Sequence, residues 1–280
     1  MFTTFADTIS TQLSEELNMG RLNGRVAIIT GGGEGIGLGI ARRFAREGAT
    51  LVIAQRKIEV GECVAQSLRE EFGVRAQFLA TDVCIKEQVE RLIADTVSRF
   101  GAIDILVNNA GGGIAPKSLA ETSDADVAYG MDLNFWSSYW AMQASFPHMQ
   151  ERGWGRIVNF GSLNGVNAHM HTAPYNIGKE AVRALTRTAA VEWGQFGICC
   201  NVICPAARTA AYDEFERTWP EAAGAITRQV PNRRMGDPER DIGGVALFLA
   251  SDDAAHVNGM TIHADGGSHV NGVAWRPDGD

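Results

Sequence analysis

The sequence predicts an α/β fold: a doubly wound, seven-stranded parallel sheet of Rossmann type with helices on both faces. From Arg25 onward, short β-branched or apolar runs alternate with longer amphipathic stretches, the pattern of strand-helix-strand units. A glycine-rich turn follows the first apolar run. The chain has 280 residues, of which 45% are hydrophobic and 21% charged, and this composition suits one globular domain. We predict an N-terminal extension at 1–22, a single domain at 23–270, and a C-terminal tail at 271–280.

Seven runs have the length and β-branched or apolar content of strands. Parallel strands joined by crossover helices place their carboxyl ends at one edge of the sheet, where ligands bind. The predicted strands are Val26–Thr30, Thr50–Ala54, Ala76–Ala80, Ile103–Asn108, Arg156–Phe160, Ile198–Ile203 and Met260–Ala264.

Amphipathic stretches between these runs predict the helices. The clearest is Ile85–Phe100, where apolar residues recur on one face and the other face is charged. The last helix has start signals: Asp237 is the predicted N-cap and Pro238 the first helical residue. The other predicted helices are Gly37–Arg46, Val60–Phe72, Asn134–Glu151 and Tyr175–Phe196, and the last is Pro238–Ala250.

Charge and cysteine content limit the partners and the compartment. With 33 acidic and 25 basic residues, the net charge is −8, so a general nucleic-acid binder is not expected. The cysteines are odd in number and lack C-x-x-C spacing, which argues against a disulfide framework or a zinc ribbon. Residues 1–22 have no basic residue before Arg21 and no apolar run, so neither a secretory signal nor a membrane span is expected. We predict a cytoplasmic protein.

The glycine-rich turn predicts a dinucleotide site. It joins the first strand directly to a helix, and glycines there let the backbone approach a pyrophosphate while the helix start offers free N–H groups. A plain tight connection is the alternative, but the strand-turn-helix context favours phosphate binding. The predicted contacts in this turn are Gly31, Gly33, Glu34, Gly35, Ile36 and Gly37.

The end of the second strand indicates which cofactor is bound. An acidic residue there would bind the ribose 2′-hydroxyl of NAD(H), but this chain has Gln55 followed by Arg56 and Lys57. A guanidinium can bind a 2′-phosphate through two hydrogen bonds. NADP(H) is therefore preferred, with NAD(H) as the alternative because Glu34 adds a negative charge to the turn.

Tyr175 and Lys179 lie four residues apart, on one face of a predicted helix. A neighbouring ammonium would lower the pKa of the tyrosine, as a general acid/base near neutral pH requires. Ser162 could donate a hydrogen bond to a substrate oxygen that gains charge. Alone, a Tyr and a Lys at this spacing more often share a solvated face.

The motifs together resemble those of the short-chain dehydrogenase/reductase family. They are the turn at Thr30–Gly37, the segment Asn108–Gly111, Ser162, and Tyr175 with Lys179, and the likeness runs from about Arg25 to Gly267. The resemblance implies a single Rossmann-type domain, NAD(P)-dependent chemistry on alcohols or ketones, and a homodimer or homotetramer. It implies no metal; His169 and His171 are a poor pair of ligands without a third.

The resemblance also implies site residues by position. Asn134 corresponds to the family's fourth catalytic residue, and Asn108 to a residue that braces the central strand. The family's Pro-Gly motif after the sixth strand is Pro205-Ala206 here, with Arg208 in place of an aliphatic residue, so this chain departs from the family's pattern there. The remaining predicted cofactor contacts are Asp82, Val83, Asn109, Ala110, Gly111, Pro205, Arg208 and Thr209.

The long segment 206–231 is predicted to be a substrate lid, because it is poorly periodic and lies between the sixth strand and the last helix. Its aromatic residues, with Met170, favour a fairly apolar ketone or secondary alcohol. Three alternatives stay open: reduction of 3-oxoacyl groups on an acyl carrier protein docked by Arg228, Arg233 and Arg234, an NAD-dependent alcohol dehydrogenase, and a redox-silent dinucleotide sensor. A halohydrin dehalogenase is disfavoured because the glycine turn and Lys179 are both present.

Overall fold

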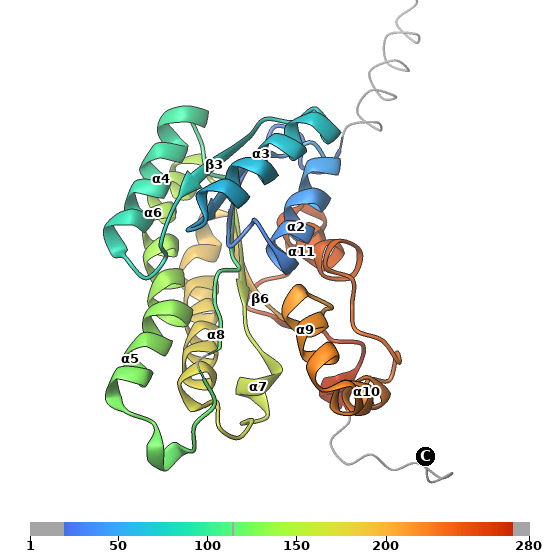
Figure 1. The fold of residues 1–280 in the computed structure, drawn as a ribbon. Helices are drawn as coiled ribbons and strands as arrows, with labels where there is room; N and C mark the ends of the chain where they lie inside the picture. Colours follow the sequence, from blue (N-terminus) through green and yellow to red (C-terminus); the bar gives the residue numbers. More distant parts are fainter. Residues whose placement is uncertain (1–19, 114, 271–280) are drawn as a thin grey trace, which may run out of the picture.

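The computed structural model describes residues 20–113 and 115–270, and it confirms the predicted sheet (Figure 1). All neighbouring strands are parallel, in the order β3-β2-β1-β4-β5-β6-β7. The predicted strand bounds agree with the structure to within two residues. The strands are β1 Val26–Thr30, β2 Thr50–Gln55, β3 Ala76–Ala80, β4 Ile105–Asn108, β5 Gly155–Phe160, β6 Ile198–Pro205 and β7 Thr261–Ala264.

Helices cover both faces of the sheet, as the fold class requires (Figure 1). One core lies between the sheet and α2, α3 and α11, and includes Phe44, Leu68 and Leu247. The other lies between the sheet and α4, α6 and α8, and includes Leu92 and Met142. The helices are α2 Gly35–Arg46, α3 Ile58–Phe72, α4 Lys86–Phe100, α6 Ser137–Arg152, α8 Ala173–Trp193 and α11 Gly243–Ala250.

The strand order reverses at β1, which pairs with β2 on one side and β4 on the other. Chains leaving β1 and β4 therefore diverge to opposite faces of the sheet, and a crevice opens at their carboxyl ends. The glycine turn leaves β1, the segment from Asn109 leaves β4, and Ser162 follows β5. This edge of the sheet positions the site.

The helix predicted to begin at Asn134 begins ten residues earlier. Helix α5, Asp124–Met131, runs through a π-helical turn at Asp132–Trp136 directly into α6. Asn134 is therefore inside a continuous helical run, and the predicted start of this helix is wrong. The start is capped instead by Ser123, whose hydroxyl accepts from the Asp126 N–H while the Asp126 carboxylate accepts from the Ser123 N–H.

The segment predicted to be a lid contains two helices, α9 at Ala210–Thr218 and α10 at Pro220–Gln229. Tyr212 joins them, because its hydroxyl lies 2.8 Å from the Thr227 hydroxyl. The prediction that this segment is poorly periodic is wrong, because both α9 and α10 are regular helices. The start of α9 is capped by Thr209, whose hydroxyl accepts a hydrogen bond from the Tyr212 N–H.

The predicted domain start is also slightly wrong. Leu22 is fully buried in the core and its N–H donates to the Glu47 carbonyl at 3.0 Å, so it belongs to the domain. The rest of the predicted extension, except residues 20 and 21, and the predicted tail lie outside the described residues. Every described helix is too short or too polar to span a bilayer.

Asp104 lies just before β4, at the amino ends of β1 and β4, and its buried carboxylate joins the two strands there. Its side chain accepts from the Val26 N–H at 2.8 Å and lies 3.5 Å from Arg25 and 3.3 Å from Arg152. Asp104 itself is fully buried, whereas both arginines reach solvent. Its carboxylate therefore satisfies one buried N–H and two cations.

We expect Asp104→Ala to lower the free energy of unfolding by about 2–4 kcal/mol, because it leaves a buried N–H unpaired and removes the partner of two arginines. Urea denaturation followed by circular dichroism would measure the change. Asp253→Ala is the control, since it removes an exposed ion pair with Arg21 and should cost less than about 1 kcal/mol. Equal losses in the two variants would contradict this role for Asp104.

Candidate active site

The glycine turn brings helix α2 against the end of β1. The Gly31 N–H donates to the Ala54 carbonyl at 2.7 Å, and Gly31 has a φ of 64°, in the left-handed region that favours glycine. A Cβ at Gly37 would lie 2.1 Å from the Gly31 oxygen, so any larger residue would displace the helix. The turn therefore places the first N–H groups of α2 close to the crevice.

The segment after β4 is tied to the same turn. The Asn109 side chain donates to the carbonyls of Thr30 at 2.9 Å and Gly31 at 3.2 Å, and the Ala110 N–H donates to the Thr30 hydroxyl at 3.0 Å. Asn108 instead points to β5, where its amide donates to Asn159 at 2.8 Å. This hydrogen bond joins β4 to β5 and is consistent with the predicted bracing of the central strand by Asn108.

A groove runs along the carboxyl ends of β1, β2 and β4. Predicted contacts from four separate segments meet there, and the groove has a glycine backbone and a helix start for a pyrophosphate, as a dinucleotide requires. Gly33 packs directly on Gln55, whose side-chain oxygen lies 2.1 Å from the position of a Gly33 Cβ. The residues that line the groove include Gly31, Glu34, Gln55, Arg56, Lys57, Asp82, Val83, Ala110, Gly111 and Gly112.

Ser162 and Tyr175 meet at the end of β5. Ser162 follows the strand and caps the short helix α7, Leu163–Val166, where its oxygen accepts from the Asn164 N–H at 3.1 Å. Its hydroxyl also interacts with the phenol of Tyr175, in the first turn of α8, and this interaction acts to lower the pKa of the phenol. Two hydroxyls from different elements are thus held at one point.

Lys179 is buried one helical turn after Tyr175. Its ammonium donates to the Phe160 carbonyl at 3.0 Å and lies 5.7 Å from the centre of the Tyr175 ring. A Cβ at Gly111 would lie 2.9 Å from the Lys179 nitrogen and 2.9 Å from the Asn134 side-chain oxygen. Glycine at 111 therefore lets the segment after β4 pass against both side chains.

Asn134 lies in the π-helical turn between α5 and α6 and is buried. Its amide donates to the carbonyls of Gly112 and Gly130, both at 3.1 Å, and its oxygen accepts from the Gly112 N–H at 3.2 Å. Turns of this kind often occur at functional sites. Here the turn aims Asn134 at Gly112 and fixes the wall of the site beside Lys179.

The pKa of Tyr175 is raised, whereas the sequence led us to expect that Lys179 lowers it. Burial is the main cause and raises the pKa of Tyr175, while the hydrogen bond from Ser162 opposes it. Burial also lowers the pKa of Lys179, to about 8. In this geometry the Lys179 ammonium is held by the Phe160 carbonyl, and the phenol of Tyr175 is protonated at neutral pH.

Of the two cofactor contacts predicted after β6, Thr209 lies near the glycine turn and Arg208 does not. Thr209 lies at the glycine turn, because its methyl carbon is 3.4 Å from the position of a Gly35 Cβ. Arg208 is directed to α9 instead, where it pairs with Asp213 at 2.7 Å and with Glu216. Its predicted contact with the cofactor is not supported, since two carboxylates already neutralise it. Pro205 ends β6, opposite Ala264 of β7.

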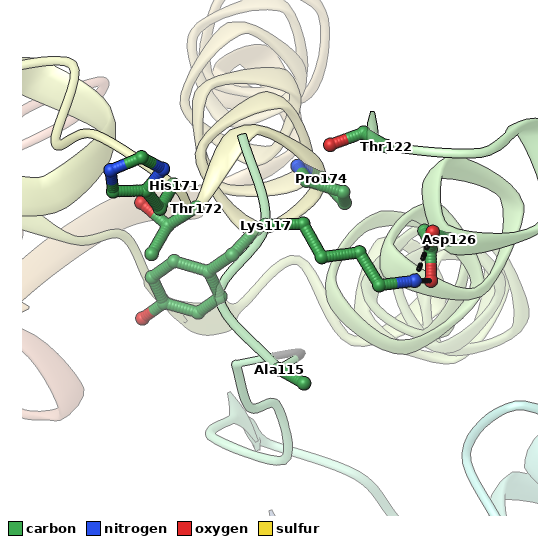
Figure 2. A pocket seen from close by; sticks show the side chains of 8 residues that line it. Ala115, Lys117, Thr122, Asp126, His171, Thr172 and Pro174 are labelled. Carbon is green, nitrogen blue, oxygen red and sulfur yellow. Dashed lines mark hydrogen bonds and ion pairs between the residues drawn. The ribbon is translucent and has the colours of Figure 1, made fainter. Parts of the chain in front are cut away.

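A second pocket reaches Tyr175 from the side of α5 (Figure 2). Lys117 crosses it and donates to both Asp126 oxygens at 2.9 and 2.7 Å, while His171 and Thr172 lie on the opposite side from Asp126. Sequence reasoning missed Lys117 and Asp126; the start signal Ser123-x-x-Asp126 could have placed the latter on a helix beside the site.

The comparisons with known proteins agree with this geometry. The model of a protein family described as enoyl-(acyl carrier protein) reductase, a branch of the short-chain dehydrogenases, matches residues 31–269. The chain belongs to the short-chain dehydrogenase/reductase family. It is thus an NAD(P)-dependent oxidoreductase that acts on CH–OH groups or the corresponding carbonyls. The family therefore disfavours the alternative of a redox-silent dinucleotide sensor.

Two relatives and one solved structure illustrate the family. The chain is 36% identical over 258 residues to a 12α-hydroxysteroid dehydrogenase of a Clostridium species, covering 89% of this chain and 98% of that protein. It is 35% identical to the L-fucose dehydrogenase of Oryctolagus cuniculus, covering 88% and 85%. The crystal structure of levodione reductase superposes with a TM-score of 0.85 at 32% identity, covering 90% and 100%.

The burial of Lys179 predicts a pH-dependent stability. Its pKa falls from 10.5 to about 8 on folding, which corresponds to about 3 kcal/mol. Between pH 8 and 10.5 the unfolded chain binds more protons at this group than the folded chain, so its contribution to the free energy of unfolding rises with pH. We expect the wild type to gain up to about 3 kcal/mol relative to Lys179→Met across this range.

Urea denaturation of both proteins at pH 7.5, 9 and 10.5 would measure this difference. The cysteines and the other lysines titrate in both proteins, and their contributions cancel in the comparison. A difference that stays constant with pH would show that the Lys179 side chain is hydrated in the folded protein.

Proposed function

We propose that the protein is an NADP(H)-dependent oxidoreductase that uses Tyr175 as general acid/base on a ketone or secondary alcohol. The carrying observation is that the buried Lys179 ammonium, bonded to the Phe160 carbonyl at 3.0 Å, lies 5.7 Å from the Tyr175 ring and beside Gly111 of the groove, with Ser162 following the same strand. These groups share one edge of the sheet with the glycine turn, which is the arrangement that hydride transfer requires.

The proposed mechanism assigns one task to each side chain. In oxidation, the Tyr175 oxygen accepts the alcohol proton; in reduction, it donates that proton to the forming alkoxide. Ser162 donates a hydrogen bond to the same substrate oxygen as it gains charge. When bound, NADP(H) supplies the hydride or accepts it. Lys179 would bind the nicotinamide ribose.

The site holds the cofactor through the contacts that line the groove. The turn from Gly31 to Gly37 binds the pyrophosphate, and Asp82 and Val83 bind the adenine end. Arg56 supports NADP(H), because it is 70% exposed and its one ion pair among the described residues, with Asp82, is long at 3.9 Å. Lys57 contributes less, since its ammonium is bound to Glu34 at 2.9 Å.

The alternative of an acyl carrier protein substrate is less well supported, because two of the arginines proposed to dock that protein already have partners within this chain. Arg234 pairs with Asp241, and the Arg233 guanidinium donates to the Arg228 carbonyl at 2.7 Å. We propose a small-molecule substrate bound under α9 and α10. Homo-oligomer formation is proposed through the aromatic face of α6, where Trp136 is 38% exposed and stacks on Trp140.

We expect Tyr175→Phe to lower kcat by about 10²–10⁴-fold, because the general acid/base is lost while the ring is kept. Reduced-nicotinamide absorbance against a panel of ketones and alcohols would measure turnover. Fluorescence titration should find cofactor affinity within about threefold of the wild type. Tyr139→Phe, a change on α6, is the control and should keep full activity. Turnover that survives in Tyr175→Phe would assign proton transfer to another group.

For the cofactor, we expect Arg56→Ala to weaken NADPH binding by about 10–100-fold and NADH binding by about twofold or less, because a charge-assisted hydrogen bond to the 2′-phosphate is lost. Isothermal titration calorimetry with both cofactors measures the two constants. Arg99→Ala, an exposed change on α4, controls for the general loss of positive charge. Equal effects on both cofactors would remove the assignment of Arg56.

A further inference from the structure

We propose that the pocket beside Tyr175 binds a second, uncharged oxygen of the substrate, so that the preferred substrate carries a hydroxyl or carbonyl group in addition to the one that reacts. This inference rests on the proposed function, because it concerns the same reaction. It departs from the fairly apolar substrate that the aromatic residues of the lid and Met170 suggest, since Met170 is 82% exposed and outside this pocket.

The pocket is small, has both polar and apolar walls, and shares the Tyr175 side chain with the proposed reacting centre. It has room for about one water-sized group. An apolar group entering it could not bond to the donors that remain free there, whereas a single oxygen fits in size and in hydrogen bonding. Its polar lining beside Tyr175 consists of Lys117, Thr122, Asp126, His171 and Thr172.

Two of these side chains keep hydrogen-bonding capacity for a ligand. Lys117 has three ammonium N–H groups and directs bonds to the two oxygens of Asp126, which leaves a donor. Within the part of the chain that the structure describes, neither ring nitrogen of His171 makes a hydrogen bond. By contrast, the Thr172 hydroxyl is already bonded to the His169 carbonyl and the Asn176 side-chain oxygen, both at 3.0 Å.

The backbone holds these side chains in place. His171 has a φ of 65°, which is unusual for a residue with a side chain and marks a position fixed by its surroundings. Its carbonyl accepts from the Lys117 N–H at 3.0 Å, which joins the loop before α8 to the segment after β4. The two backbone segments that carry the proposed donors are thus bonded to each other.

Charge decides between a neutral oxygen and a carboxylate. The Lys117 ammonium and the Ser123 hydroxyl hold the pKa of Asp126 far below its usual value, so this group remains negative. Glu121, whose pKa is also lowered, mainly by Ser118, interacts with both His171 and Lys117. Asp126 neutralises Lys117 through an ion pair at 2.7 Å, so the lysine offers no unbalanced positive charge to an anionic substituent.

The test compares cyclohexanone with its 2-, 3- and 4-hydroxy derivatives and with 4-oxocyclohexanecarboxylate. For the wild type, we expect kcat/KM to rise about tenfold for at least one hydroxyketone over cyclohexanone, the gain of about one net hydrogen bond. The carboxylate should fall below cyclohexanone. The readout is the ratio of kcat/KM values within one protein, which is independent of the active fraction of each preparation.

Two variants remove the proposed donors with little strain. Lys117→Met keeps the aliphatic stem, and His171→Gly keeps a residue that tolerates the positive φ. Each should reduce the hydroxyketone ratio to about twofold or less. Lys86→Met is the matched control, because it removes a lysine–carboxylate pair with Glu90 on the distant helix α4 and should keep the wild-type ratio.

The outcomes separate this inference from the proposed function. Turnover of the ketones without a preference for any hydroxyketone, or a preference that both variants retain, would overturn the inference and leave the oxidoreductase assignment intact. A preference for the carboxylate would also overturn it. Failure to turn over any ketone or alcohol with either cofactor would overturn the proposed function and this inference with it.

Discussion

The site depends on a lysine ammonium held out of water. Lys179 is 5% exposed, and among the described residues its hydrogen bond is to the Phe160 carbonyl, at the end of β5. A charge in such a place is tolerated only where partners surround it. Those partners come from separate elements: the strand end of β5, the glycine at 111 after β4, and the π-helical turn that carries Asn134. Close packing around this cation explains why Gly111 cannot be larger, since a Cβ there would lie 2.9 Å from the Lys179 nitrogen.

A parallel sheet is what makes this convergence possible. Because all seven strands run in one direction, their carboxyl ends supply loops to a single edge of the sheet. Hydrogen bonds join some of these loops to one another. Asn109 ties the segment after β4 to the turn after β1, and the Lys117 backbone ties it to the loop before α8. The rigid part of the site is therefore the set of strand ends, and the loops between them carry the differences between family members.

Sequence reasoning was strongest where a local pattern has a single physical cause. The strands read from β-branched runs, the N-cap at Asp237 and the face of Ile85–Phe100 agree with the structure, because burial and capping act over a few residues. It failed where an element that the pattern did not reveal decides the outcome. Asn134 was predicted to begin a helix, but α5 and the π-helical turn precede it and place it inside a longer helical run. Arg208 looked free, but α9, whose periodicity was not recognised, supplies Asp213 and Glu216.

The electrostatic prediction failed for a similar reason. Spacing correctly placed Tyr175 and Lys179 on one helix face, but spacing does not report desolvation, and burial shifts both groups toward their neutral forms. A tyrosine with a raised pKa is a good proton donor only to a strong base, such as a forming alkoxide. A positive charge near the phenol would stabilise the tyrosinate, the form that accepts a proton from an alcohol. For the proposed role of Tyr175 as general acid/base, the chain alone therefore favours proton donation in reduction, and the charge of an oxidised nicotinamide would favour proton acceptance in oxidation.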